Sequence, residues 1–191
     1  MTTTLATTTA IPAYQAGTWV LDPVHSEVSF TVRHLMVSKV RGRFARFDGT
    51  LVTADNPLHS SVEARVDLTS IDTGNADRDA HVRSADFLDV EQFPELTYRS
   101  TGIRTAGDGL VVDGELSLHG VTKQVPLELE VNGFQANTPM GDTRVGFSAR
   151  AEIDRGDFGI EFNAPLDNGG VVLGNRIQIT LEVEAVLQTE A

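Results

Sequence analysis

Alternation of apolar and polar side chains with a period of two residues is the feature of this sequence that most constrains its fold. In residues 61–68, Val62, Ala64, Val66 and Leu68 are apolar, and the residues between them are charged. Successive side chains of a β-strand point to opposite faces of a sheet. The pattern therefore predicts a strand with one buried face and one solvated face.

The same alternation recurs along most of the chain, in residues 24–33, 47–51, 125–131, 145–153 and 177–188. The last run is the longest, and its polar face is acidic. Glycine-containing dipeptides lie between or beside these runs, and several of them are expected to close hairpins because glycine readily adopts positive φ values. These dipeptides are Asp48-Gly49, Asp108-Gly109, His119-Gly120 and Gly141-Asp142. The sequence therefore predicts an all-β protein with short connections.

Two segments depart from this scheme. Asp113-Gly114 lies inside an alternating run, so Gly114 is interpreted as a strand glycine that marks a bulge or the close approach of another backbone. Residues 75–86 lose the period of two and offer both Asn and Asp residues as capping candidates, followed by small and apolar residues at spacings of three and four. One short helix is predicted there.

About eight strands and one helix must together bury one apolar face. Closing the sheet on itself buries that face and removes the exposed strand edges. An eight-stranded antiparallel β-barrel is therefore favoured. An immunoglobulin-like sandwich alternates in the same way and remains the alternative, although the long last strand and the helical segment fit it less well.

Composition narrows the function classes. The chain has 191 residues, enough for one all-β domain, and a formal net charge of −12. An acidic chain is poorly suited to binding nucleic acid or an anionic lipid surface, which attract clustered Lys and Arg. There are no cysteines, which excludes disulfides, thiolate metal sites and a cysteine nucleophile.

The amino-terminal segment differs in character from the rest. Residues 1–17 are rich in Thr and Ala and contain no Lys, Arg or continuous apolar run, so we expect a disordered tail rather than a secretory signal, followed by a barrel domain in residues 18–191. No segment approaches the roughly 20 apolar residues of a membrane-spanning helix. We therefore expect a cytoplasmic protein without stable membrane insertion.

The sequence contains none of the common catalytic motifs. A nucleophile elbow, a phosphate-binding loop and a dinucleotide fingerprint are all lacking, and the five histidines show no metal-ligand spacing, so no cofactor or metal is indicated. His81 lies near Asp77, Asp79 and Asp86. One hypothesis is a metal-dependent or acid/base enzyme that uses His34, His81 and these aspartates. The other is structural, with Asp77 and Asp79 at the start of a helix and His81 joining it to the barrel.

One dense basic cluster stands out in this acidic chain. It consists of Arg33, His34, Lys39, Arg41 and Arg43. The cluster is interpreted either as a contact for a polar or phosphorylated head group or as a solvated turn, since surface charge is common. A scaffold that binds a protein partner through its acidic surface is a third functional hypothesis.

Several ordered segments make the chain similar to a known family. They are Trp19–Asp22, His25–Phe30, Val32–Met36, Gly42–Phe44, Phe47–Gly49, Asp77–Asp89, Phe93–Ser100, Gly114–Lys123 and Asp154–Ile160. In this order they resemble the YceI-like family of lipocalin-like polyisoprenoid-binding proteins, over roughly residues 18–187. Many relatives are exported, but the absence of their signal here keeps the expectation of a cytoplasmic location.

The resemblance implies a lipocalin-like barrel, closed at one end by the helix, that binds and transports or stores a long apolar lipid. The ligand would be a polyisoprenoid, an isoprenoid quinone or a fatty-acid-like amphiphile; no catalysis is implied, and a homodimer is one oligomeric state that relatives suggest. Large and small inner residues are mixed, which permits a channel but also suits a solid core. The expected ligand-binding residues are Phe30, Val32, His34, Phe44, Phe47, Val62, Val66, Phe147, Phe158 and Phe162.

Overall fold

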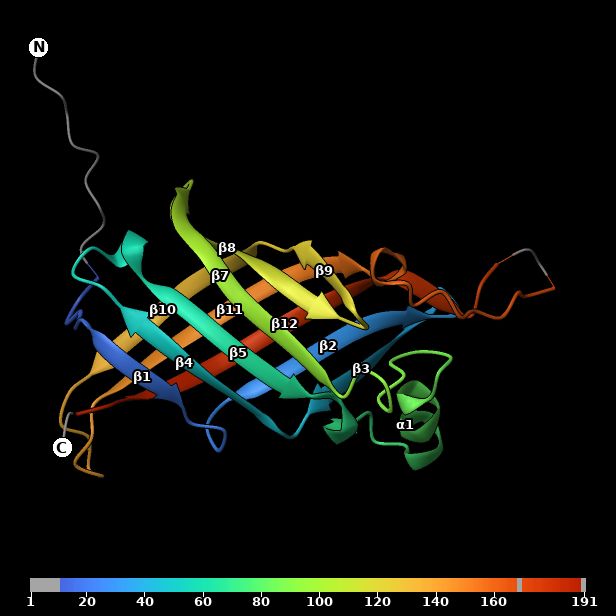
Figure 1. The fold of residues 1–191 in the computed structure, drawn as a ribbon, viewed down its shortest axis with the longest axis horizontal. Helices are drawn as coiled ribbons and strands as arrows, with labels where there is room; N and C mark the ends of the chain where they lie inside the picture. The colour runs from blue at the N-terminus through green and yellow to red at the C-terminus, as the bar shows by residue number, and fades with distance from the viewer. Residues whose placement is uncertain (1–10, 168–169, 190–191) are drawn as a thin grey trace, which may run out of the picture.

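A computed structural model describes residues 11–167 and 170–189 of the chain, and Figure 1 shows their arrangement. None of the helices in these residues has the length and apolar character needed to cross a membrane. The strands are β1 (Gly17–Leu21), β2 (Glu27–His34), β3 (Ser38–Phe44), β4 (Phe47–Thr53), β5 (Ser61–Asp67), β6 (Ile71–Asp72), β7 (Glu95–Ala106), β8 (Gly109–Leu118), β9 (Val121–Gln124), β10 (Leu127–Gln135), β11 (Arg144–Asp154) and β12 (Leu173–Leu187). The helices are α1 (Ala76–Arg83) and the single-turn 3-10 helices η1 (Pro57–His59), η2 (Leu68–Ser70) and η3 (Arg155–Phe158).

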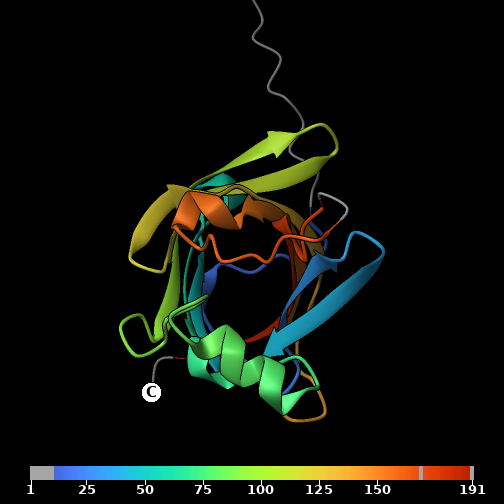
Figure 2. The same ribbon diagram turned by 90° about the vertical axis from the view of Figure 1, so that its right-hand side faces the viewer.

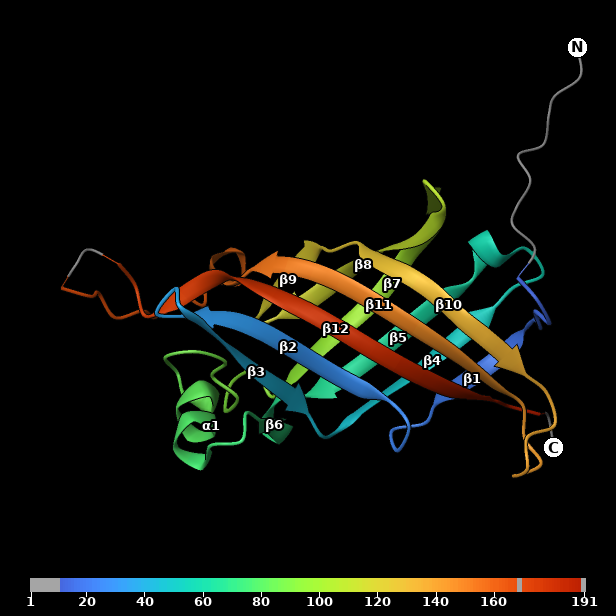
Figure 3. The ribbon, with the colours of Figure 1, turned by 180° about the vertical axis from the view of Figure 1, so that it is seen from behind.

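Eight antiparallel strands form a closed ring in the order β1-β4-β5-β7-β8-β10-β11-β12. The ring closes where β1 pairs with the end of β12, with Trp19 opposite Leu187. Along its earlier part β12 pairs with β2 instead, and β3 and β6 continue from β2. Figure 3 shows β12 between β11 and β2. The predicted eight-stranded barrel is confirmed, because pairing β1 with β12 leaves no free edge in the ring.

Helix α1 lies at one end of the barrel, at the lower rim of the end that faces the viewer in Figure 2. The Asn75 side chain accepts a hydrogen bond from the Arg78 amide at 2.9 Å, as expected of an N-cap residue. The buried Asp79 carboxylate accepts from the amide and hydroxyl of Thr73 at 2.9 and 2.6 Å, which fixes the helix to the residues after β6. The predicted short helix is confirmed, and it lies at one end of the barrel.

The glycine dipeptides have different structural roles. His119 and Gly120 have φ values of 52° and 74° and form the two-residue turn between β8 and β9, as predicted. Asp48-Gly49, by contrast, lies inside β4. A Cβ on Gly49 would lie 2.9 Å from the Glu63 carbonyl oxygen on the neighbouring strand β5. This glycine therefore permits close strand packing rather than a turn.

Two groups of buried side chains fill the two ends of the barrel. One surrounds Leu68 and Phe158 near α1 and η3, and the other surrounds Trp19, Val145 and Ala185 near the closure of the ring. Trp19 is fully buried, and its indole Nε1–H donates to the Thr53 hydroxyl at 2.7 Å. This tryptophan is therefore part of the core.

Residues 11–17, part of the segment predicted to be a disordered tail, contact the barrel. Residues 1–10 lie outside the described residues, but Gly17 is already the first residue of β1. The Tyr14 hydroxyl donates to the Ala54 carbonyl at 2.6 Å, and its ring lies 5.2 Å from that of Phe134. Residues 11–17 are therefore packed against the barrel, because an aromatic side chain in this polar segment finds an apolar partner.

Candidate binding cavity

A cavity of about 210 Å³ lies inside the barrel. Every strand of the closed ring contributes inward-facing apolar side chains to its lining, because the period of two places alternate residues of each strand on the inner face. These side chains include Leu21, Leu51, Ala64, Leu96, Ile103, Leu110, Val112, Leu127, Leu129, Val131, Ala149, Ile179, Leu181 and Val183. The barrel is therefore partly hollow rather than solid.

Six of the ten residues predicted to bind ligand line this cavity. Phe47 and Val66 are directly paired across β4 and β5, and the rings of Phe30 and Phe44 lie 5.7 Å apart across β2 and β3. The six are Phe30, Phe44, Phe47, Val62, Val66 and Phe147. Contact between these side chains and a ligand remains a prediction.

The other four predicted residues do not line the cavity. Val32 is buried farther along β2, and His34 ends that strand opposite Leu173. Phe158 belongs to η3, is 1% exposed and fills the end of the barrel near α1. Phe162 is 40% exposed and packs against Phe87. The inner row of β11 ends at η3, so Phe158 and Phe162 do not continue it as an apolar pattern alone suggests.

The sequence analysis did not predict the residues that line the cavity at the end nearest residues 11–14. Ile11, Tyr14 and Phe134 line it there. Phe134 continues the strand that carries Leu129 and Val131, but a register shift between Val131 and Gly133 changes which residues of β10 point inward. Ile11 and Tyr14 lie in a segment without alternation, so no periodic signal identifies them. Their role follows from tertiary packing alone.

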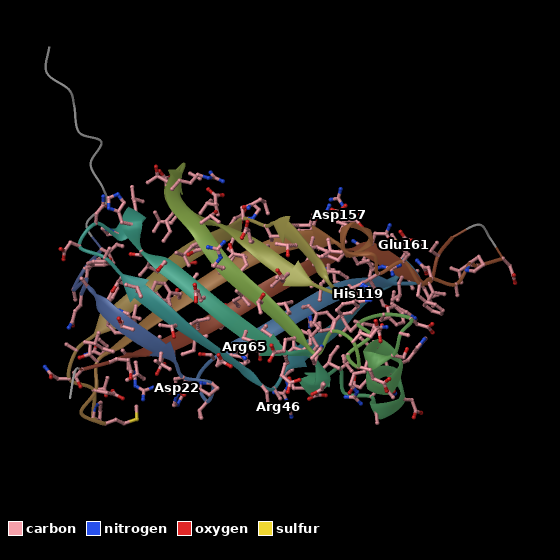
Figure 4. The ribbon with its side chains drawn as sticks, viewed as in Figure 1. Asp22, Arg46, Arg65, His119, Asp157 and Glu161 are labelled. Atoms are coloured by element: carbon pink, nitrogen blue, oxygen red, sulfur yellow. The ribbon has the colours of Figure 1, made fainter. Side chains whose placement is uncertain are left out.

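Few polar groups lie near the cavity. The Tyr98 hydroxyl is buried within hydrogen-bond distance of the Val112 and Val125 carbonyl oxygens, at 3.1 and 3.0 Å. Burial raises the pKa of Tyr98 above its usual value, so the phenol stays protonated near neutral pH. The charged residues in the described lining, Asp48 and Arg65, lie opposite each other on β4 and β5 (Figure 4 labels Arg65). An apolar ligand is favoured, because an unpaired polar group pays a desolvation penalty in such a cavity.

His81 joins α1 to the segment after η3. Its Nε2 lies 2.8 Å from Asp86 Oδ2, and its ring lies 5.0 Å from Phe87 and 5.2 Å from Phe162. Neither His81 nor His34 is among the residues that line the cavity. These contacts fit the predicted structural role of His81, which is to join the helix to the barrel. The cavity does not bring His81 and His34 together, so it does not support the enzyme hypothesis.

An ion network supports the closure of the barrel. The Asp22 carboxylate lies 2.8 Å from His25 Nδ1 and 2.7 Å from a guanidinium nitrogen of Arg144, which also contacts Glu184. The hydrogen bond from His25, followed by that from Arg144, lowers the pKa of Asp22 to about 2. Potential metal-ligand atoms of Asp22, His25 and Glu184 lie within 4.8 Å of one another. The Arg144 guanidinium, however, already supplies their positive charge, so the network is structural.

Comparison with known proteins finds a matching family model and similar sequences. Residues 19–185 match the family model of the YceI-like domain. A protein named YceI from Salmonella newport (strain SL254) is 39% identical over 165 residues, which cover 86% of this chain and 83% of that protein.

Solved structures show the same barrel. The crystal structure of Burkholderia cenocepacia BcnA has a TM-score of 0.70 with 21% identity, covering 86% of this chain and 98% of that one. A polyisoprenoid-binding domain from Saccharophagus degradans, implicated in plant cell wall breakdown, has a TM-score of 0.67 with 16% identity, covering 91% of this chain and 100% of that one. At these identities the structural likeness establishes the fold.

Proposed function

The chain belongs to the family of YceI-like domains, and on that premise we propose that it binds a long apolar lipid inside its barrel, as a non-enzymatic carrier. The ligand class is a polyisoprenoid, an isoprenoid quinone or a fatty-acid-like amphiphile. The observation that carries the proposal is the cavity, which is lined mostly by apolar side chains from every strand of the ring. The polyisoprenoid-binding domain from Saccharophagus degradans, which shares the fold, supports the ligand class.

The cavity dimensions favour a single chain over a broad ring system. Its volume of about 210 Å³ lies below the range of roughly 300–1,000 Å³ that is common for drug-sized ligands. Its lining nevertheless extends from Tyr14 and Ser60 at one end to Leu116 and Val125 towards the other. Each buried methylene of a ligand contributes about 0.8 kcal/mol, so a chain occupying this space needs no polar anchor for affinity.

Organic extraction of the purified protein followed by mass spectrometry tests the proposal. We expect a stoichiometric isoprenoid or fatty-acid-like molecule that is absent from a control protein purified from the same host. The apo protein obtained by delipidation is then titrated with geranylgeraniol. A clean extract together with no saturable binding would contradict the proposal.

Two blocking substitutions locate the ligand. Ala64→Phe and Ala149→Phe each place a ring in the cavity, from β5 and β11. Ala106→Phe adds the same bulk at the exposed end of β7, outside the cavity, and is the matched control. We expect lipid to be lost from both blocking variants and retained by the control, with circular dichroism spectra confirming that all three fold. Retention of lipid by both folded blocking variants would place the ligand elsewhere.

A further inference from the structure

The turn between β2 and β3 carries three consecutive exposed hydrophobic residues, which we call the apolar tip. Leu35 is 39% exposed, Met36 53% and Val37 83%. The Leu35 amide donates to the Val172 carbonyl at 2.7 Å, which places the tip against the segment that leads into β12. Met36 and the 40% exposed Val171 line the same surface groove. The described residues expose nine large hydrophobic side chains, and four of them gather here.

The backbone of the apolar tip is strained at two residues. The Val37 amide donates to the His34 carbonyl at 3.2 Å and closes a turn whose central residues, Leu35 and Met36, have φ values of 51° and 58°. Such a turn strongly favours Asn-Gly, because bulky side chains at positive φ are sterically disfavoured. The sequence therefore places large apolar side chains where small polar ones would be more stable. This type of strain is typical of a functional surface.

Unpaired cations lie behind the apolar tip. Arg33 and Lys39 are directly opposite each other on β2 and β3, and Arg41 is the next residue on the same face of β3. Like charges opposite each other destabilise a strand pair. Arg43 and Arg176 have carboxylate partners, Asp72 and Glu152, whereas Arg33, Lys39 and Arg41 have none among the described residues. These three cations therefore keep their charge available for an external anion.

The groove beside the apolar tip contains carboxylates as well as cations. Three carboxylates border the groove: Glu152 and Asp154 from β11, and Glu161 from the segment after η3. Figure 4 labels Glu161. Glu152 is occupied by Arg176, and Asp154 accepts the Gly156 amide at 2.8 Å. Mixed charge makes the groove itself unsuitable as an anion site. Arg33 and Lys39 border this groove as well, whereas Arg41, Leu35 and Val37 lie outside its lining. The charged side chains within residues 33–41 are all cationic, so the β2–β3 turn itself presents an apolar tip with positive charge.

We propose that the apolar tip, together with Arg33, Lys39 and Arg41, docks the protein reversibly on an anionic lipid bilayer. Leu35, Met36 and Val37 would enter the head-group layer while the three cations meet lipid phosphates. Each such cation strengthens vesicle binding about five-fold. The net charge of −12 on the whole chain repels the same surface, so docking requires the apolar tip and its cations to face the bilayer. The proposal does not depend on the lipid in the cavity, because these residues lie outside its lining.

Vesicle flotation tests the charge requirement. The wild-type chain is expected to float with phosphatidylcholine vesicles that contain phosphatidylglycerol, to bind pure phosphatidylcholine much more weakly, and to be released by salt. Arg33→Gln with Lys39→Gln should weaken binding about 25-fold, at about five-fold per charge. Lys123→Gln with Arg150→Gln is the matched control, because it removes the same charge from two exposed residues on β9 and β11. Equal losses in the two double variants, or no loss in either, would overturn the proposal.

A second variant tests the apolar contribution while preserving the fold. Leu35→Asn with Met36→Gly introduces the residues that the turn geometry favours, so the melting temperature should not fall. Vesicle binding should be lost, and the lipid recovered by extraction should be unchanged. Val24→Asp, at an 81% exposed position between β1 and β2, is the control and should bind vesicles like the wild type. Sedimentation velocity is run in parallel: a wild-type dimer that becomes monomeric in the Asn-Gly variant would make the tip an interface between two copies and overturn the bilayer proposal.

Discussion

The ring of Tyr98 occupies the space into which a side chain on Gly114 would point. A Cβ atom on Gly114 would lie less than 3.0 Å from the hydroxyl end of that ring, and 2.8 Å from the Arg99 carbonyl oxygen. The Gly114 carbonyl accepts a hydrogen bond from the Val125 amide at 2.8 Å. Gly114 therefore allows the connection between β9 and β10 to reach β8 while Tyr98 packs beneath it, which confirms the predicted close approach at this strand glycine.

Gly114→Ala should lower the free energy of unfolding by about 1–3 kcal/mol, because the added methyl group overpacks a site bounded partly by backbone. Urea unfolding followed by Trp19 fluorescence measures the change. Gly102→Ala is the control, since no atom lies within 4 Å of the position that its added methyl group would occupy and its φ is not in the left-handed region. A similar loss in both variants would show that lost strand flexibility, and not the Tyr98 contact, is responsible.

The Trp19–Thr53 hydrogen bond should contribute measurably to stability. Thr53→Val removes the acceptor and leaves the buried indole N–H unpaired, which should cost about 1–3 kcal/mol. A double-mutant cycle with Trp19→Phe isolates the pair, with an expected coupling of about 1 kcal/mol, measured by chemical denaturation followed by circular dichroism. A coupling near zero would mean that the two side chains stabilise the barrel through packing alone.

Acidification should remove the stabilisation that Asp22 contributes. Its pKa of about 2 in the folded protein lies below the ordinary value of 3.8, so the stabilising effect is nearly complete above about pH 4 and is lost as the pH falls through about 2. After allowance for solvent screening, the effect is about 1–2 kcal/mol. We expect Asp22→Asn to be less stable than the wild type by this amount at pH 6 and equally stable near pH 2, by urea unfolding across the range. A difference that does not change with pH would assign the loss to altered packing.

Affinity for linear alcohols and prenols should rise with chain length and then level off. Each methylene added within the cavity strengthens binding by up to about four-fold, which corresponds to 0.8 kcal/mol. The rise should stop once the chain fills the space between Tyr14 and the plugged end near Phe158. Displacement of a fluorescent fatty acid from delipidated protein measures the series. Affinity that depends on the head group but not on chain length would argue against an enclosed tail.

The local part of this structure could be read from the sequence. The alternating rows around Val62, Ala149 and Leu181 predict strands because a period of two has one structural explanation, and the loss of that period after Asn75 predicts the helix. Six cavity-lining residues were identified in the same way, since an apolar residue on an alternating strand must face the inside of a closed barrel.

The positions that alternation could not place depend on how distant segments meet. Phe158 and Phe162 looked like a continuation of the inner row, but η3 turns Phe158 into the core at one end and leaves Phe162 against α1. Tyr14 lies in a segment without periodicity and acquires its position only from Phe134 and Ala54. The sequence by itself determined the strands, the helix and which faces are apolar, because these follow from local geometry and neighbouring residues. Only the tertiary structure decided where the ring closes, which inner side chains leave a cavity and which fill an end, because each of these depends on the register between strands far apart in the chain.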